Sequence, residues 1–235
     1  MAEFKAWPKT PRLFRDITVT EKIDGTNAAI IISDPFSFGS HIDGTPEGTT
    51  LGLGPDNEGG TPDLEYLVSA QSRKRLVTPG KQTDNYGFAG WVYDNAHALA
   101  QLLGPGYHYG EWWGNGINRG YDQTEKHFSL FNTHRYKGIK EASMGLLDVV
   151  PVLYQGPFSE EAIRDALYEL DGWGSAVAPE FSNPEGVIVY HSASSQVYKV
   201  LIEHDELPKG LIPYSEKVLA ETAGRGDWRE SGAYL

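Results

Sequence analysis

The 235-residue chain contains no cysteine, which excludes disulfide scaffolds, thiolate zinc sites and cysteine nucleophiles. It also lacks the run of about 18 apolar residues that a membrane helix needs, and no apolar signal-peptide segment follows Met1. A chain of this length can bury about 70% of its unfolded surface, so it can fold without disulfides or metals. These absences predict a soluble cytoplasmic protein.

Positive charge is scarce, because 20 lysines and arginines face 32 acidic residues and the formal net charge is −12. Nucleic-acid affinity comes mainly from cationic contacts to phosphate, so a polynucleotide partner would need a local basic patch. One candidate is Arg73–Arg75 with Lys81, and a second comprises Arg135, Lys137 and Lys140. Charge runs of this kind are more often solvated surfaces than binding sites.

Several common catalytic signatures are missing as well. The chain has no Walker A sequence, no Gly-x-Gly-x-x-Gly before a helix, no His-Glu-x-x-His and no Gly-x-Ser-x-Gly. Its seven histidines are scattered without metal-ligand spacing. The familiar nucleotide-binding folds therefore have no support.

The apolar patterns predict short strands with two interspersed helical regions, which is typical of an α+β fold built on antiparallel sheets. Helices are expected over 87–103 and from Ser159, a hydroxyl cap, to Gly172. Residues 34–65, rich in Gly, Pro, Asp and Thr, predict a mobile loop or a loosely paired excursion. The expected strands are 17–20, 28–32, 67–70, 107–113, 128–131, 146–154, 185–190 and 197–202.

The segment Glu21–Asn27 lies between two of these strands. Lys22 ends the first strand, and Asp24-Gly25 favours a tight reversal because glycine tolerates positive φ. We therefore expect a hairpin that points Lys22 into a concavity, as a nucleophilic amine requires. From these residues alone, Lys22 could also be an ordinary surface cation beside a simple turn.

Further polar segments follow Lys22-Ile23-Asp24-Gly25-Thr26-Asn27 in a fixed order. Together they resemble motifs I, Ia, III, IIIa, IV and V of the covalent nucleotidyltransferase superfamily of ligases and capping enzymes. Thr26-Asn27 resembles the RNA ligases of the phage T4 RNA ligase 2 and kinetoplastid editing-ligase type, whereas DNA ligases usually carry arginine at the position of Asn27. The other segments are Ser72-Arg73, Tyr109–Gly114, Phe128–Asn132, Pro184–Val189 and Val197–Val200.

The resemblance implies an α+β nucleotidyltransferase (ATP-grasp-like ligase) core of two antiparallel β-sheets that form an ATP groove with flanking helices. This domain would span 1–207, and 208–235 would be a short tail without a separate C-terminal domain, as in a minimal phage-like form. The implied enzyme is an ATP-dependent RNA ligase that seals 5′-phosphate and 3′-hydroxyl RNA ends, with RNA repair for a bacteriophage as the natural setting. We expect a monomer, with a separate RNA-repair partner as an option.

The resemblance also assigns the reacting groups. Lys22 would take AMP from ATP, and Lys199 with Mg²⁺ (or Mn²⁺) would favour its neutral amine and offset phosphate charge. An unperturbed lysine, with a pKa near 10.4, is neutral in only about one molecule in 10³ at pH 7, so such help is needed. Glu185 would be the metal ligand, although it could be a surface carboxylate at a strand end. Asp24 would lie near the phosphates or the metal shell.

Five further residues would contact the nucleotide. Glu111 would hydrogen-bond the ribose, and Phe131 would stack on the adenine, although it could be a core phenylalanine like Phe128. Arg73 would contact phosphate of ATP or of the RNA end. Asn27 would lie near the phosphates, and Glu21 beside the adenine edge, through its side chain or through its backbone alone.

Two departures from the family pattern leave alternatives open. Motif V usually carries two lysines two positions apart, but Lys199 is followed at that interval by Leu201, so one phosphate-facing cation is missing unless Lys209 replaces it. Asn132 replaces an acidic residue after the stacking phenylalanine. A DNA ligase, a capping guanylyltransferase and a non-catalytic nucleotide- or RNA-binding module are the competing interpretations, and an intact Lys22 motif opposes the last.

Overall fold

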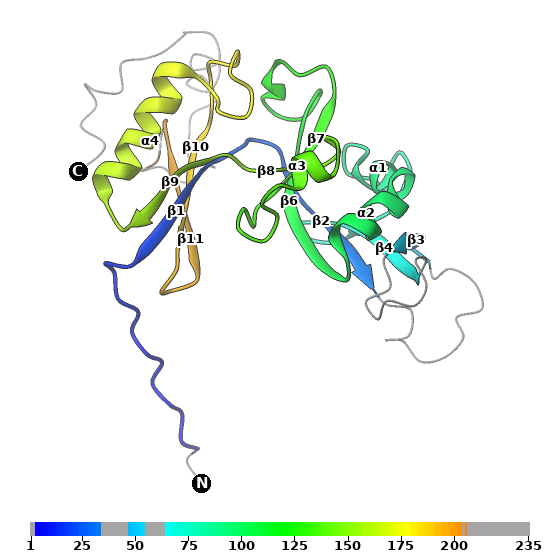
Figure 1. Ribbon diagram of the computed structural model, residues 1–235, viewed down its shortest axis with the longest axis horizontal. Helices are drawn as coiled ribbons and strands as arrows, with labels where there is room; N and C mark the ends of the chain where they lie inside the picture. Colours follow the sequence, from blue (N-terminus) through cyan, green and yellow to red (C-terminus); the bar gives the residue numbers. More distant parts are fainter. Residues whose placement is uncertain (1–2, 34–46, 55–63, 204, 206–235) are drawn as a thin grey trace. The chain divides into compact units, whose positions relative to one another are not determined.

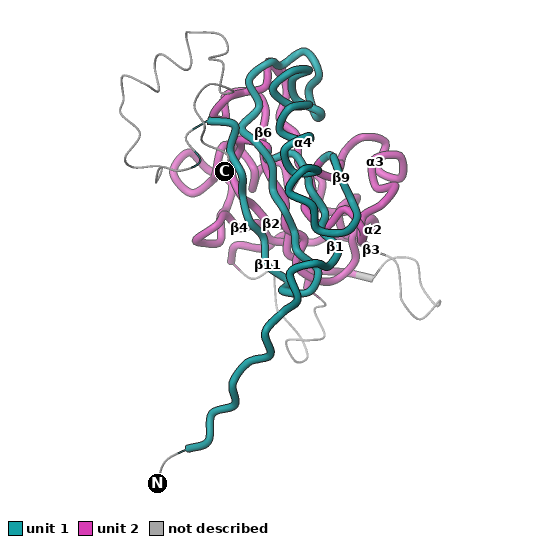
Figure 2. The backbone as a smooth tube through the Cα atoms, turned by 90° about the vertical axis from the view of Figure 1, so that its left-hand side faces the viewer, with its two compact units in different colours: residues 1–22, 151–235 teal, residues 23–150 magenta. Residues whose placement is uncertain are grey.

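The computed structural model describes residues 3–33, 47–54, 64–203 and 205. The chain forms two compact units, coloured separately in Figure 2. Unit 1 comprises Met1–Lys22 and Pro151–Leu235, and unit 2 comprises Ile23–Val150. The chain thus leaves unit 1 directly after Lys22 and returns to it at Pro151. The predicted domain end at residue 207 lies outside the described residues.

Unit 1 contains a four-stranded antiparallel sheet with the order β11-β10-β1-β9. The helix α4 (Glu160–Trp173) covers one face, where Val19, Leu170 and Val189 belong to a common apolar cluster (Figure 1). Alternate residues of β1 and β10 face this cluster, as the period of two requires. The strands are β1 (Asp16–Glu21), β9 (Val152–Pro157), β10 (Gly186–His191) and β11 (Gln196–Leu201).

The predicted start of α4 is confirmed, because the Ser159 hydroxyl accepts a hydrogen bond from the Ala162 N–H at 3.1 Å. Its end lies slightly beyond Gly172. The helix continues to Trp173, and Gly174 ends it with φ of 90°. A side chain at Gly174 would also meet the Phe181 carbonyl oxygen at 2.7 Å, so glycine is needed there on both counts.

Unit 2 contains a seven-stranded sheet with the order β3-β4-β2-β6-β7-β8, in which β5 also pairs with β4. The α+β fold built on two sheets is as predicted, and all pairs are antiparallel except β7–β8 at one edge, which is parallel. The connection from β7 to β8 contains helix α3 (Ile139–Ala142) and is long enough for a parallel crossover. The strands are β2 (Thr26–Ser33), β3 (Thr50–Gly54), β4 (Leu64–Ser72), β5 (Leu76–Val77), β6 (Gly106–Gly114), β7 (Lys126–Leu130) and β8 (Asp148–Val149).

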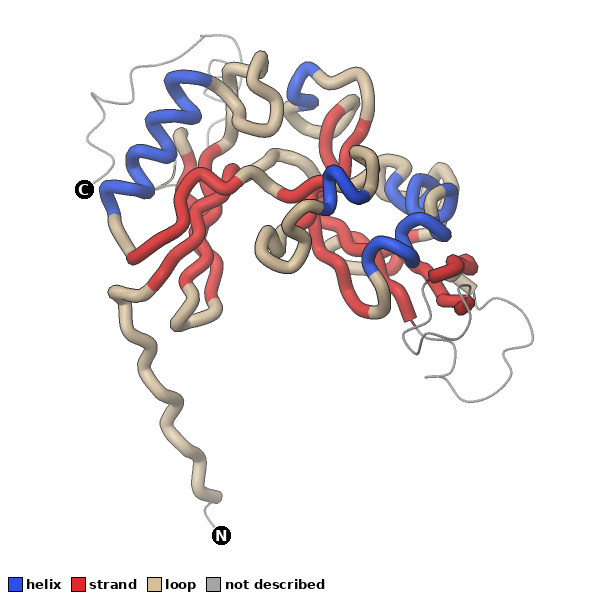
Figure 3. The backbone as a smooth tube through the Cα atoms, viewed as in Figure 1, coloured by secondary structure: helices blue, strands red, loops and turns tan. Residues whose placement is uncertain are grey.

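The single helix predicted over 87–103 is two helices, α1 (Phe88–Asp94) and α2 (Ala96–Leu103) (Figure 3). They meet at Asn95, whose side-chain amide donates to the Trp91 carbonyl at 2.8 Å. Both helices share an apolar cluster with the even-numbered residues of β2. Among the helices of the described ranges, none combines the length and apolarity that a membrane crossing would demand.

Two predicted segments, 34–65 and 146–154, differ from their predicted structure. Residues 50–54, inside the expected loop 34–65, form β3 and pair with β4; residues 34–46 and 55–63 of that range lie outside the described residues. The predicted strand 146–154 is in fact β8 in unit 2 and β9 in unit 1. Pro151 lies between them and cannot donate to a strand ladder, which explains the interruption.

The predicted hairpin at Asp24-Gly25 is wrong. β1 pairs with β9 and β10, whereas β2 pairs with β4 and β6, so the two strands belong to different sheets. Gly25 is not among the residues with positive φ. A Cβ there would instead lie 2.5 Å from the Trp112 carbonyl oxygen and 2.9 Å from Glu111 Cγ. Glycine is required at this position by close packing against β6.

Candidate functional site

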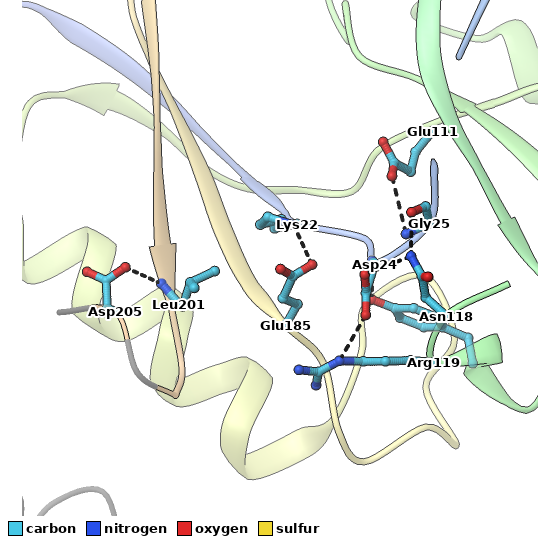
Figure 4. Close-up of polar contacts among 10 residues, drawn as sticks. Lys22, Asp24, Gly25, Glu111, Asn118, Arg119, Glu185, Leu201 and Asp205 are labelled. Atoms are coloured by element: carbon cyan, nitrogen blue, oxygen red, sulfur yellow. Dashed lines mark hydrogen bonds and ion pairs between the residues drawn. The ribbon is translucent and has the colours of Figure 1, made fainter. Parts of the chain in front are cut away.

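Lys22 follows the last residue of β1 and forms an ion pair with Glu185 (Figure 4). Its backbone N–H donates to the Gly186 carbonyl at 2.8 Å, which extends the β1–β10 pairing to the lysine itself. Both side chains of the pair are partly buried. The predicted nucleophile and the predicted metal ligand are therefore in direct contact, on the same unit.

Gly186 determines where Glu185 lies. It has φ of 146°, and a Cβ there would lie 2.2 Å from the Val200 carbonyl oxygen. The Ile202 N–H donates to the Glu185 carbonyl at 3.1 Å, which ties this residue to the end of β11. A glycine must therefore follow Glu185 in the sequence, because only glycine lets β10 begin this close to β11.

The Lys22–Glu185 pair has a chemical consequence. An ammonium in an ion pair has no lone pair, so the amine must lose its proton before it can attack phosphorus. Glu185 supplies a hard oxygen ligand that could exchange the ammonium for a divalent cation. Within the described ranges, no group of three or more His, Asp or Glu side chains could enclose a metal. The residues present fit Mg²⁺ bound through one carboxylate, with waters and phosphate oxygens completing its shell.

Glu21, the neighbour of Lys22, has a buried carboxylate. It accepts hydrogen bonds from the Ser175 hydroxyl at 2.6 Å and from the Val177 N–H at 2.9 Å. Burial raises the pKa of Glu21, and the hydrogen bond from Ser175 partly opposes this shift. The carboxylate therefore ties the segment after α4 to the end of β1. These bonds engage both carboxylate oxygens of Glu21, and its predicted contact with adenine stays a prediction.

In unit 2, Asp24 is held by a loop that the sequence analysis missed (Figure 4). Its backbone N–H donates to the Tyr121 hydroxyl at 2.8 Å. Its carboxylate pairs with Arg119 Nε at 3.3 Å and accepts a hydrogen bond from Asn118 Nδ2 at 3.1 Å. The same Asn118 amide donates to the Gly25 carbonyl. Asp24 is therefore held in place by contacts within unit 2.

This loop has an unusual backbone. Asn118, Tyr121 and Asp122 have φ of 43°, 53° and 53°, a region that costs non-glycine residues of the order of 1–3 kcal/mol each. Such strain persists only where the surroundings impose it. Nothing in the sequence could identify the contact with Asp24, because Asn118 lies 94 positions away and neither residue belongs to a periodic pattern.

Three sequence-predicted residues lie on one face of the unit 2 sheet. Asn27 is directly opposite Glu111, and Phe131 follows β7 beside Tyr109, whose carbonyl accepts its N–H at 3.0 Å. The even-numbered residues of β2 pack with the helices, so these three lie on the other face. Phe131 is 39% exposed and is therefore not a core residue, unlike Phe128.

Glu111 and Asn27, the two polar residues on this face, differ in their hydrogen-bond partners. Glu111 accepts a hydrogen bond from the Gly25 N–H at 3.2 Å. The half-buried amide of Asn27 has no hydrogen-bond partner among the residues that the structure describes. Arg73 is exposed in the turn after β4, where the Ser72 N–H donates to the Arg75 carbonyl at 2.8 Å.

Lys199 is the last of the predicted cations that the structure describes; Lys209 lies outside the described residues. It lies on β11 opposite Ile188, which in turn lies opposite Thr20 of β1. These residues occupy the face of the unit 1 sheet that does not carry α4, because Val19 and Val189 face the helix. Lys199 is exposed.

The comparisons with known proteins agree with this fold. Three solved structures of Naegleria gruberi RNA ligase variants match it, two with ATP and Mn and one with AMP and Mn. The first two are 15% identical, with TM-scores of 0.53 and 0.52, and the matches cover 81% of this chain and 51% of theirs. The third is 14% identical, with a TM-score of 0.50 and coverage of 80% and 50%. The chain thus spans about half the length of these proteins. The likeness shows a nucleotidyltransferase-type α+β fold with two sheets.

A comparison with curated proteins found no significant match. Among protein families, the RNA ligase family matches residues 15–201, a range that includes both sheets and every candidate site residue described above. The chain therefore belongs to the RNA ligase family.

Proposed function

We propose that this protein is an ATP-dependent RNA ligase that works through a covalent lysyl-AMP on Lys22. The observation that carries the proposal is the Lys22–Glu185 pair: a partly buried amine at a strand end, fixed by a backbone hydrogen bond and held by a single carboxylate. Together with membership of the RNA ligase family, this arrangement favours a nucleophile over a surface cation.

In the first step, the Lys22 nitrogen attacks the α-phosphorus of ATP. A nitrogen–phosphorus bond forms, the bond from that phosphorus to the pyrophosphate oxygen breaks, and the amine proton passes to solvent. Glu185 holds the Lys22 ammonium in the free enzyme, and it is the residue that would hold a divalent metal, in which case its carboxylate would no longer pair with Lys22. Mg²⁺ (or Mn²⁺) bound there would supply charge neutralisation at the phosphates.

The nucleotide contacts are assigned to residues with suitable exposure and chemistry. Phe131 has an exposed ring for the adenine, and Glu111 a carboxylate for the ribose hydroxyls. Asn27, whose amide has no partner in the described part of the chain, would donate to a phosphate oxygen. Lys199 and Arg73 would supply exposed positive charge to ATP or to the RNA end.

Two further steps complete the reaction. AMP moves from Lys22 to the 5′-phosphate of RNA, forming a pyrophosphate linkage and freeing the amine. A 3′-hydroxyl oxygen then attacks the RNA phosphorus, the bond to AMP breaks, and the strands are sealed. Repair of broken RNA in a bacteriophage-infected cell is the proposed setting.

The test uses ATP labelled at the α-phosphate, with Mg²⁺, followed by denaturing gels. Wild type should retain the label, Lys22→Ala should lose it, and Lys137→Ala, a control at an exposed lysine outside the site, should retain it. Loss of the metal by chelation should abolish labelling. Nicked and single-stranded RNA and DNA substrates with 5′-phosphate and 3′-hydroxyl ends then test the substrate. Sealing of DNA alone would contradict the RNA assignment.

A further inference from the structure

Residues 3–15, which we call the arm, differ from the rest of the protein in charge. Lys5, Lys9, Arg12 and Arg15 oppose only Glu3, so the arm carries +3 in a chain whose net charge is −12. Among the residues that the structure describes, none of these four cations has an ion-pair partner. Their charge is therefore available to an external anion.

The arm also exposes large aromatic rings. Phe4, Trp7 and Phe14 are 93%, 89% and 78% exposed. Isolated exposed apolar residues are common. Aromatic rings that alternate with cations along one segment, however, are typical of proteins that bind single-stranded nucleic acids.

The arm is anchored at one end only. The Arg15 carbonyl accepts a hydrogen bond from the Phe158 N–H at 3.0 Å, and the Leu13 carbonyl one from His191 Nε2 at 2.7 Å. The Phe14 ring packs edge-on against Phe158 at 6.1 Å. Residues 3–12 make no hydrogen bond, ion pair or ring contact within the described structure.

Residues 3–12 are extended and lead away from the sheet of unit 1 (Figure 1). The sequence explains this, because Pro8 and Pro11 fix their own φ and disfavour helix at Trp7 and Thr10. A protein segment that is already extended loses less conformational entropy when it binds a partner.

We infer that the arm binds an unpaired RNA strand, with its lysines and arginines on phosphates and with Trp7 and Phe4 stacked on bases. The identity of the polymer rests on the proposed RNA ligase function. Arg15 precedes Lys22 by seven positions, with β1 between them, which is about 23 Å at about 3.3 Å per residue. RNA held on the arm is therefore tethered to the unit that carries Lys22, which raises the local concentration of its reacting end.

The experiment measures binding of a fluorescent single-stranded RNA without a 5′-phosphate, by anisotropy, over a range of salt concentrations. The charge variant is Lys5→Gln, Lys9→Gln, Arg12→Gln. Its control removes three cations outside the arm, the candidate site and both basic patches: Arg164→Gln, Lys217→Gln, Arg229→Gln. Both variants lower the net charge from −12 to −15, so a difference between them reports position and not total charge.

For single strands, each neutralised phosphate contributes about 0.7 to the slope of log affinity against log salt. The charge variant should therefore lower the slope by about 2, and its control should change it little. Trp7→Ala should weaken binding about fivefold or more, the loss of one stacked base. Trp173→Ala, a control at a tryptophan that is 86% exposed, should bind like wild type.

Equal losses in the charge variant and its control would overturn the inference, as would unchanged affinity and slope in the arm variants. A dimer that depends on Trp7, with RNA affinity unchanged, would assign the arm to self-association instead. Labelling by ATP is measured on the same proteins and should not change in the arm variants. If wild type binds RNA through the arm but takes no label, the proposed function fails and the arm inference stands.

Discussion

Replacing Gly25 by alanine tests how the site is held. The added Cβ would lie 2.5 Å from the Trp112 carbonyl oxygen, 2.8 Å from Trp113 Cβ and 2.9 Å from Glu111 Cγ. Ordinary carbon contacts are about 3.5–4.0 Å, so the chain must move by roughly 0.5–1 Å. Overpacking of this kind costs about 1–3 kcal/mol of stability. Because Lys22 is three residues away, labelling by ATP should fall by up to about 10²-fold, as misplacements near 1 Å do.

A second substitution separates close packing from turn geometry. If Gly25 were needed for positive φ, Asn should be better tolerated than Ala, because Asn adopts left-handed conformations more readily. Close packing predicts the reverse, since Asn is larger. Gly116 is the matched control: its φ is 74° and a Cβ there meets nothing within 4 Å, so Gly116→Asn should be milder than Gly116→Ala.

The assays are urea unfolding and the rate of labelling by α-phosphate-labelled ATP, on all four variants. The reasoning is refuted if Gly25→Asn is as stable and as active as wild type while Gly25→Ala is not. It is equally refuted if Gly25→Ala costs less than about 0.5 kcal/mol, the scatter of ordinary surface substitutions.

Three other predictions concern single residues. Burial lowers the pKa of His108 from 6.5 to about 4, and its neutral ring contacts the Tyr136 hydroxyl and the Gly104 carbonyl. The contribution of His108 to the free energy of unfolding is therefore complete above pH 6.5. It is lost as the pH falls towards 4, and the loss is about 2–3 kcal/mol at pH 4.5. Urea unfolding should show a smaller loss in His108→Gln, and an equal loss would exclude this residue as the cause. Glu185→Ala should fold normally but lose metal-dependent labelling, and normal labelling across a Mg²⁺ titration would remove it from the metal site. Phe131→Leu should weaken ATP binding by about 1 kcal/mol or more in calorimetry, whereas unchanged affinity would end its stacking role.

Local patterns in the sequence predicted most individual elements. The apolar run 28–32 lies within β2, and the hydroxyl of Ser159 caps α4 as expected. These features depend on residues near one another in the chain. The contacts between distant segments were predicted less well, because the partner of a strand is a non-local choice. β1 pairs with β10, about 170 positions away, and Asp-Gly could suggest only a local turn.

The candidate site divides in the same way. Motif order placed Lys22 and Glu185 in one site, and the structure brings these two side chains together. Pattern and resemblance gave no indication of Asn118, Arg119 or Ser175, because these residues act by contacts with Asp24 and Glu21 that no periodicity encodes. The arm was also missed, since its significance lies in exposure, which composition alone does not reveal.

The most direct test of the central claim is to locate the nucleotide on the protein. After incubation with ATP and Mg²⁺, proteolysis and tandem mass spectrometry should place AMP on the side-chain nitrogen of Lys22. AMP on another residue, or efficient RNA sealing by Lys22→Ala, would contradict the account.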